Sequence, residues 1–108
     1  MTNELKNPPC FASRLNSMGE RLDLWSGDNN VLGWIARQGT IKGLKLVDFN
    51  SPQHLEGLTL KEVTSALENV SLRTGAVCTR FPADFEGGAF SNPEPSKRKA
   101  AINLVLNA

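Results

Sequence analysis

One segment, Gly43–Leu67, constrains the fold of this chain more than any other. Its first part, Gly43–Phe49, is a short apolar run, typical of a strand that is buried on both faces. Pro52 ends the strand because proline cannot donate to a strand ladder. Thr59 and Glu62 then form a T-x-x-E capping box, in which each side chain can bond the other's free backbone N–H. Apolar residues follow at helical spacing: Leu60, Val63 and Leu67. The segment therefore predicts a strand and a crossover helix, one half of a βαβ unit.

The same alternation continues on both sides of this segment. Cys10–Leu15 and Thr74–Phe81 are predicted strands, the second because it is rich in β-branched and aromatic residues. A helix is predicted over Asn29–Gln38, with Asp28 as its N-cap and Gly39 at its end.

A last helix is predicted after Asn92, which would cap it, with Pro93 at the first helical position. Residues 1–9 read as a flexible polar lead-in, and residues 10–108 as one α/β unit of order β-α-β-α-β-α. Right-handed crossovers would place all three helices on one side of a three-stranded parallel sheet.

Composition narrows the function classes. The 108 residues fit one small domain, and a net charge of +1 argues against a nucleic-acid partner. The basic run Lys97–Lys99 reads as a solvated helix face. No apolar run approaches the roughly 20 residues that span a bilayer, and the N-terminus lacks a signal-peptide core, so a cytoplasmic protein is expected.

Cys10 and Cys78 match no metal or redox spacing and are predicted to be reduced core residues, with a disulfide or a catalytic thiol as the lesser alternatives.

The predicted sheet would be left partly uncovered by this chain alone. Parallel sheets are normally covered on both faces, but helices on one side leave the other face bare and both edges unpaired. The sheet is therefore expected either to belong to a longer barrel or to be completed by another chain.

Three stretches carry a resemblance to a known family: CFASRLNSM, GLKLVDFNSPQHLEGLTLKEV and AVCTRFPADFEGGAFSNPEPSKRKAAINL. Together they resemble the opening third of the xylose-isomerase-like TIM barrels, which are sugar and sugar-phosphate isomerases and epimerases. The resemblance implies a partial (β/α)8 barrel, whose whole would have about 250 residues and its site at the C-terminal strand ends. In that family a divalent metal (Mn, Mg, Co or Zn) is held by residues from later strands, so no metal is expected on this chain alone.

The resemblance and the strand ends together select the candidate site residues. His54 is the candidate for proton transfer between sugar oxygens, and its alternative is a surface loop histidine. Arg80 and Arg14 end two strands and are candidates for binding a sugar hydroxyl, a carboxylate or a phosphate. For Arg80 the alternative is a salt bridge to Asp84 or Glu86.

Three further residues complete the substrate-binding prediction. Asn50 ends the second strand beside Asp48, and turn or capping roles are the alternative for both. Trp25 and Phe90 are candidates for walls on which a sugar stacks; filling the barrel mouth is the alternative. Zinc-cluster endonucleases share this superfamily, but a single histidine and the lack of a basic stripe argue against that activity.

The sequence thus predicts the N-terminal (βα)3 part of a metal-dependent sugar isomerase or epimerase. The partner of the full-length parent would be a sugar or sugar phosphate, with no nucleic acid and no membrane. The chain alone is expected to be inactive. The alternative is a non-catalytic module that self-associates or pairs with a partner chain through its exposed sheet surface.

Overall fold

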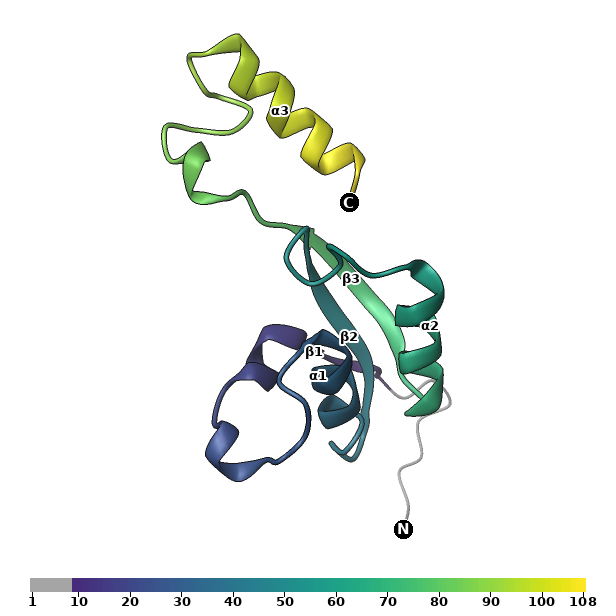
Figure 1. The fold of residues 1–108 in the computed structure, drawn as a ribbon. Coiled ribbons are helices and arrows are strands. Elements are labelled where there is room, and N and C mark those ends of the chain that lie inside the picture. The colour runs from purple at the N-terminus through teal and green to yellow at the C-terminus, as the bar shows by residue number, and fades with distance from the viewer. Residues whose placement is uncertain (1–8) are drawn as a thin grey trace.

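Three parallel strands form the centre of the structure, a computed structural model that describes residues 9–108. The sheet order is β1-β2-β3, with β2 in the middle (Figure 1). The strands are β1 (Phe11–Arg14), β2 (Leu44–Ser51) and β3 (Arg73–Thr79), and the α-helices are α1 (Val31–Gln38), α2 (Leu60–Asn69) and α3 (Pro95–Leu106). This confirms the α/β class with a parallel sheet. The predicted lead-in lies outside the described residues except for Pro9.

Helix α2 begins at Leu60, directly after the predicted cap, Thr59. The Thr59 side chain accepts the backbone N–H of Glu62 at 3.1 Å. The Glu62 carboxylate, however, accepts from the Thr59 hydroxyl at 3.1 Å, so the second half of the box differs from the prediction.

The other two helices begin later than predicted. Helix α1 is capped by Asn30, whose side chain accepts the N–H of Gly33 at 2.8 Å, and not by Asp28. The chain at Asp28 instead crosses the first turn of α1 so closely that a Cβ on Gly33 would lie 2.0 Å from the Asp28 carbonyl oxygen. This close approach requires a glycine at position 33.

Helix α3 begins at Pro95 with Glu94 as its N-cap, so the predicted start at Pro93 is wrong. A residue that precedes proline is disfavoured in the helical region, and Glu94 is accordingly extended. Asn92 shapes the preceding loop instead. Its side chain accepts from the N–H of Glu94 at 2.9 Å and donates to the carbonyl of Gly88 at 2.8 Å.

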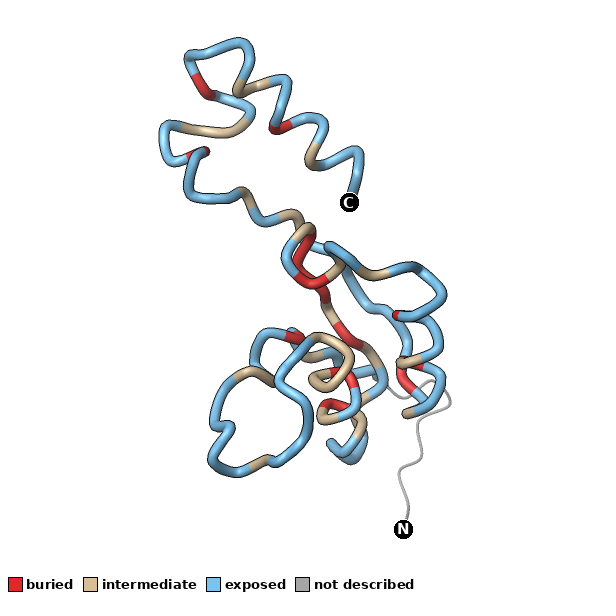
Figure 2. The backbone as a smooth tube through the Cα atoms, in the orientation of Figure 1, coloured by how far each residue is buried: buried red, intermediate tan, exposed pale blue. Residues whose placement is uncertain are grey.

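The core lies between β2 and the two helices α1 and α2. Val47 and Phe49 point from β2 into this layer and are 0% and 1% exposed, and Figure 2 shows the buried stretch along β2. They pack with a cluster contributed by the helices and loops: Leu15, Ile35, Val63, Leu67 and Leu72. Gln38 of α1 is fully buried and donates to the carbonyls of Ser13 and Leu46, which ties the helix to β1 and β2.

Helix α3 does not join this layer, so the prediction of three helices on one side holds for α1 and α2 only. Figure 1 shows α3 beyond the C-terminal ends of the strands, reached by a segment that leads away from the sheet. The radius of gyration is 17.0 Å, against about 13 Å for a compact chain of this length.

Residues 81–108 form a lobe that packs on itself. Phe85 and Ala101 are buried within it, at 9% and 0% exposure. Lys97 bonds Asp84 at 2.9 Å, and Arg98 donates to the carbonyl of Asn92 at 2.7 Å. Lys97 and Arg98 are therefore half-buried contacts that hold α3 to the loop before it, and only Lys99 of the basic run keeps the predicted solvated position.

Both cysteines are exposed and unpaired, so the prediction of core cysteines is wrong. Cys78 lies on β3, all of which is exposed or half-buried, because the strand is at the edge of the sheet and α2 leaves a hollow beside it. No helix in the described residues is long and apolar enough to cross a membrane.

Candidate functional site

The C-terminal ends of the parallel strands bring several predicted residues to one edge of the sheet. Side chains alternate along a strand, so Asp48 and Asn50 point away from the face on which Val47 and Phe49 meet the helices. We call this second, uncovered face the open face. Arg14 pairs with Asp48 in the ladder and donates from Nη2 to Oδ1 of Asn50 at 3.3 Å, which places its side chain on the open face.

Arg80 continues the ladder one residue beyond β3. Its backbone N–H donates to the carbonyl of Ser51 at 2.8 Å. The alternation then places Arg80 on the same face as Cys78, the ladder partner of Asn50. The side chain is exposed, and the predicted alternative, an ion pair with Asp84 or Glu86, is absent among the described residues; Asp84 pairs with Lys97 instead.

The polar residues at this end of the open face form one group, which we call the polar edge. Its members are Arg14, Asp48, Asn50, Cys78 and Arg80. Lower on the same face lie the apolar or small side chains of Ala12, Leu44, Leu46 and Ala76, together with the charged side chain of Arg73, the ladder partner of Leu46. Below the polar edge the open face is therefore mainly apolar, with Arg73 as the exception.

Asp48 has a structural role within the polar edge. The register between β2 and β3 shifts beside it, so that Gly75 and Ala76 together oppose this single residue in a β-bulge. Its Oδ1 accepts the N–H of Ala76 at 2.8 Å. A Cβ on Gly75 would lie 2.4 Å from that oxygen, so glycine is what leaves room for the carboxylate. A glycine inside a strand is the sequence signal that indicates such a bulge.

His54 lies on the helix side of the strand end and not in a surface loop. It is 4% exposed, and its ring meets the edge of Trp34 at a centroid distance of 6.1 Å. The ring Nδ1 of His54 accepts the backbone N–H of Asn50 at 2.8 Å. The backbone N–H of His54 donates to the carbonyl of Asn50, also at 2.8 Å. Burial, and then the charge of Arg14, lower the pKa of His54 below its ordinary value, so the ring is neutral at pH 7. The histidine therefore fixes the backbone that presents Asn50.

Trp25 belongs to a separate cluster near α1. The guanidinium of Arg37 lies 5.4 Å from its ring centroid, and Nη1 of Arg37 donates to the carbonyls of Met18 and Glu20 at 2.8 and 2.6 Å. The segment between β1 and α1 contains two short 3-10 helices, Leu15–Gly19 and Leu22–Leu24, which Arg37 holds against α1.

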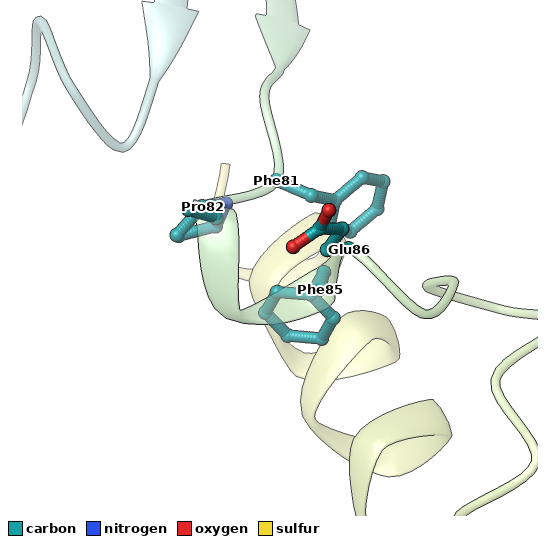
Figure 3. A pocket seen from close by; sticks show the side chains of 5 residues that line it. Phe81, Pro82, Phe85 and Glu86 are labelled. Atoms are coloured by element: carbon teal, nitrogen blue, oxygen red, sulfur yellow. The ribbon is translucent and has the colours of Figure 1, made fainter.

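Phe90 belongs to a third cluster, in the C-terminal lobe. Its ring meets Phe81 edge-on at 5.7 Å, and Phe81 packs on Phe85 at 5.5 Å. Figure 3 shows the adjoining hollow, of about 310 Å³, with Pro82, Phe85 and Glu86 around it. No contact within the described residues joins Phe90 to Trp25, so the two predicted aromatic walls do not meet.

The polar edge offers hydrogen-bond donors, and the described residues form no metal site around it. Among residues 9–108, no three His, Cys, Asp or Glu side chains gather in a way that could hold a metal ion. Comparison of the chain with protein-family models finds no match, and comparison with curated proteins finds no relative. What the edge can bind thus follows from its own chemistry, in which two guanidinium groups and an amide recognise oxygen atoms.

Proposed function

We propose that this chain supplies the first three βα units of a xylose-isomerase-like barrel whose activity is that of a metal-dependent sugar isomerase or epimerase. The strand order β1-β2-β3, with α1 and α2 over one face only, suits a segment of barrel wall. In such a wall the helices lie outside and the open face lines the interior.

One observation carries the proposal. The open face is mainly apolar in its lower part, apart from Arg73, and ends in the polar edge at the C-terminal strand ends, where Arg14 bonds Asn50. A (β/α) barrel requires this division, because its interior is packed with side chains and its chemistry occurs at the C-terminal mouth.

In the proposed enzyme the polar edge is a substrate wall. Arg14, Asn50 and Arg80 donate hydrogen bonds to sugar oxygens, and His54 keeps Asn50 in place. Phe90 and Phe81 form an aromatic side wall. The described residues do not fit a metal centre, so the metal of the proposed enzyme needs ligands from outside this segment, and no step through it is assigned to these residues.

The test is a titration of the isotope-labelled chain with an aldose and its ketose, followed by amide shifts in NMR spectra. The proposal expects weak, millimolar binding that moves the amides of Arg14, Asn50 and Arg80 and leaves those of helix α3 unchanged. Arg80→Ala should abolish the shifts, whereas Arg73→Ala, at the opposite end of β3, should preserve them. The absence of shifts, or tight binding of Mn²⁺ or Co²⁺ by the chain alone, would contradict the proposal.

A second candidate, an assembly module, is favoured by the apolar surface on β3 and its surroundings. Val77 is 44% exposed and Leu60 83%, and on α3 Ile102 and Leu106 are 50% and 76% exposed. A hollow of about 350 Å³ lies between β3 and α2, with Ala108 at its rim. This candidate expects a concentration-dependent dimer in analytical ultracentrifugation that Val77→Asp disrupts, and no response to sugars. A monomer at all concentrations would count against it.

A further inference from the structure

We infer that the polar edge is an oxyanion site, in which Arg14 and Arg80 bind a phosphate or carboxylate group over Asn50. The inference stands on the geometry of the edge and holds whether or not the ligand is a sugar. A neutral sugar needs hydrogen-bond donors but no positive charge. Two guanidinium groups on one face concentrate positive charge, which suits an anion.

The two arginines flank the same residue from opposite sides. Arg14 ends β1 and Arg80 follows β3, so both neighbour the end of β2 on the open face. Arg14 is level with Asp48, and Arg80 lies one residue beyond the pair Thr79 and Ser51. Two ladder spacings and an offset of four residues along the strands therefore separate their backbones by about 16 Å. Two extended arginine side chains can still converge on one group that lies between them over Asn50. The planar fork of a guanidinium matches the paired oxygens of a phosphate or a carboxylate.

Neither arginine is neutralised by an ion pair. Within the described part of the chain the salt bridges are Arg21–Asp23 and Lys97–Asp84. Arg14 makes one long bond, at 3.3 Å, and this leaves most of its donors free. Arg80 bonds Ser51 through its backbone alone. Both guanidinium groups are therefore available to an anion from solvent.

One carboxylate, that of Asp48, lies near the proposed anion site. Asp48 is the ladder partner of Arg14 on the open face, and its Oδ1 is already engaged with the N–H of Ala76. Its negative charge weakens anion binding without blocking the site. Asp48→Asn removes the charge and keeps an oxygen for Ala76, so this variant should bind anions more tightly than the unaltered chain.

The experiment is a titration with inorganic phosphate, acetate and a neutral sugar in separate arms, at low ionic strength, read by NMR and calorimetry. The expected result is saturable binding of phosphate or acetate that moves the amides of Arg14, Asn50 and Arg80. Whichever of the two binds more tightly identifies the group. The binding should persist when the neutral sugar has no effect, which separates this inference from the proposed sugar isomerase.

Matched variants decide whether the edge itself binds. Arg80→Ala should weaken phosphate about tenfold, the loss of one charge-assisted hydrogen bond. Arg73→Ala removes the same charge from the same strand at its other end and should change affinity by less than about twofold. Asp48→Asn should tighten binding. Equal effects of Arg73→Ala and Arg80→Ala would show a response to net charge alone and would overturn the inference, as would the lack of saturable binding. Spectra of each variant confirm that the fold is intact.

Discussion

Replacement of Gly75 by alanine tests the bulge that shapes the polar edge. The added Cβ would lie 2.4 Å from Oδ1 of Asp48, so the carboxylate must leave the N–H of Ala76. A hydrogen bond to a charged acceptor contributes about 1.5–3 kcal/mol, and the lower end applies here because the site is exposed. Gly75 does not have a positive φ, so alanine restricts the unfolded chain and contributes about 0.4–1 kcal/mol to stability. The net expectation for Gly75→Ala is a loss of about 0.5–1 kcal/mol.

The same substitution should change sign when Asp48 is absent. In an Asp48→Ala background the oxygen at 2.4 Å is gone, and the contact that remains, with Cβ of Leu46 at 3.2 Å, needs only a small shift of the exposed edge strand. Gly75→Ala should then stabilise the chain by about 0.4–1 kcal/mol. The coupling between the two positions is therefore about 1.5 kcal/mol.

Urea unfolding of the four proteins in this cycle measures the coupling. With a slope of about 2 kcal/mol per molar urea, the midpoint of Gly75→Ala should fall by about 0.4 M and rise by a similar amount in the Asp48→Ala background. Gly87→Ala is the matched control, because a Cβ there would lie 3.6 Å from its nearest neighbour, the side-chain nitrogen of Asn92. Additive effects within about 0.3 kcal/mol would refute the reasoning.

Two further predictions concern His54 and Arg37. Because burial and Arg14 lower the pKa of His54 from 6.5, the unfolded chain takes up a proton first as pH falls below 6.5. As the pH is lowered, the free energy of unfolding should therefore decrease until the pH passes the pKa of His54 in the folded chain. The variant His54→Gln should lack this decrease between pH 7.5 and 5.5. An unchanged dependence of the free energy on pH would contradict the assignment. Arg37→Ala frees the carbonyls of Met18 and Glu20, so proteolysis within residues 15–28 should accelerate, whereas Lys61→Ala should have no effect. Equal cleavage of both variants would show that Arg37 does not hold the segment.

Sequence rules predicted correctly those elements whose ends are set by residues only a few positions away. The run that ends before Pro52 and the pair Thr59 and Glu62 define β2 and α2, because a proline and a cap act within a few residues of themselves. The start of α3 was also accessible from local rules, since a residue before Pro95 is disfavoured in a helix. The prediction failed there because two prolines, Pro93 and Pro95, each satisfied the rule for the first helical position.

The position of α3 has no local cause. Helical spacing predicts the helix but not the surface on which it packs. That is decided by tertiary contacts, such as those of Lys97 with Asp84 and Phe85 in the loop that precedes the helix. The burial of His54 was hidden for the same reason, because Trp34 and the N–H of Asn50 meet the ring only after α1 and β2 have packed together.

The exposure of β3 on both faces separates the two proposed functions. On the helix side, Val77 lies beside a hollow that a helix would fill, and on the open face Cys78 and Ala76 meet solvent. A second copy that docks only on the helix side would bury Val77 but leave the polar edge open. A barrel would cover both faces of β3 at once, because each added βα unit brings a strand to the edge and a helix to the outside. The bulge at Asp48 favours the barrel on this point. Bulges are common at barrel rims and beside active sites, and this one lies level with Arg14 and four residues before Arg80.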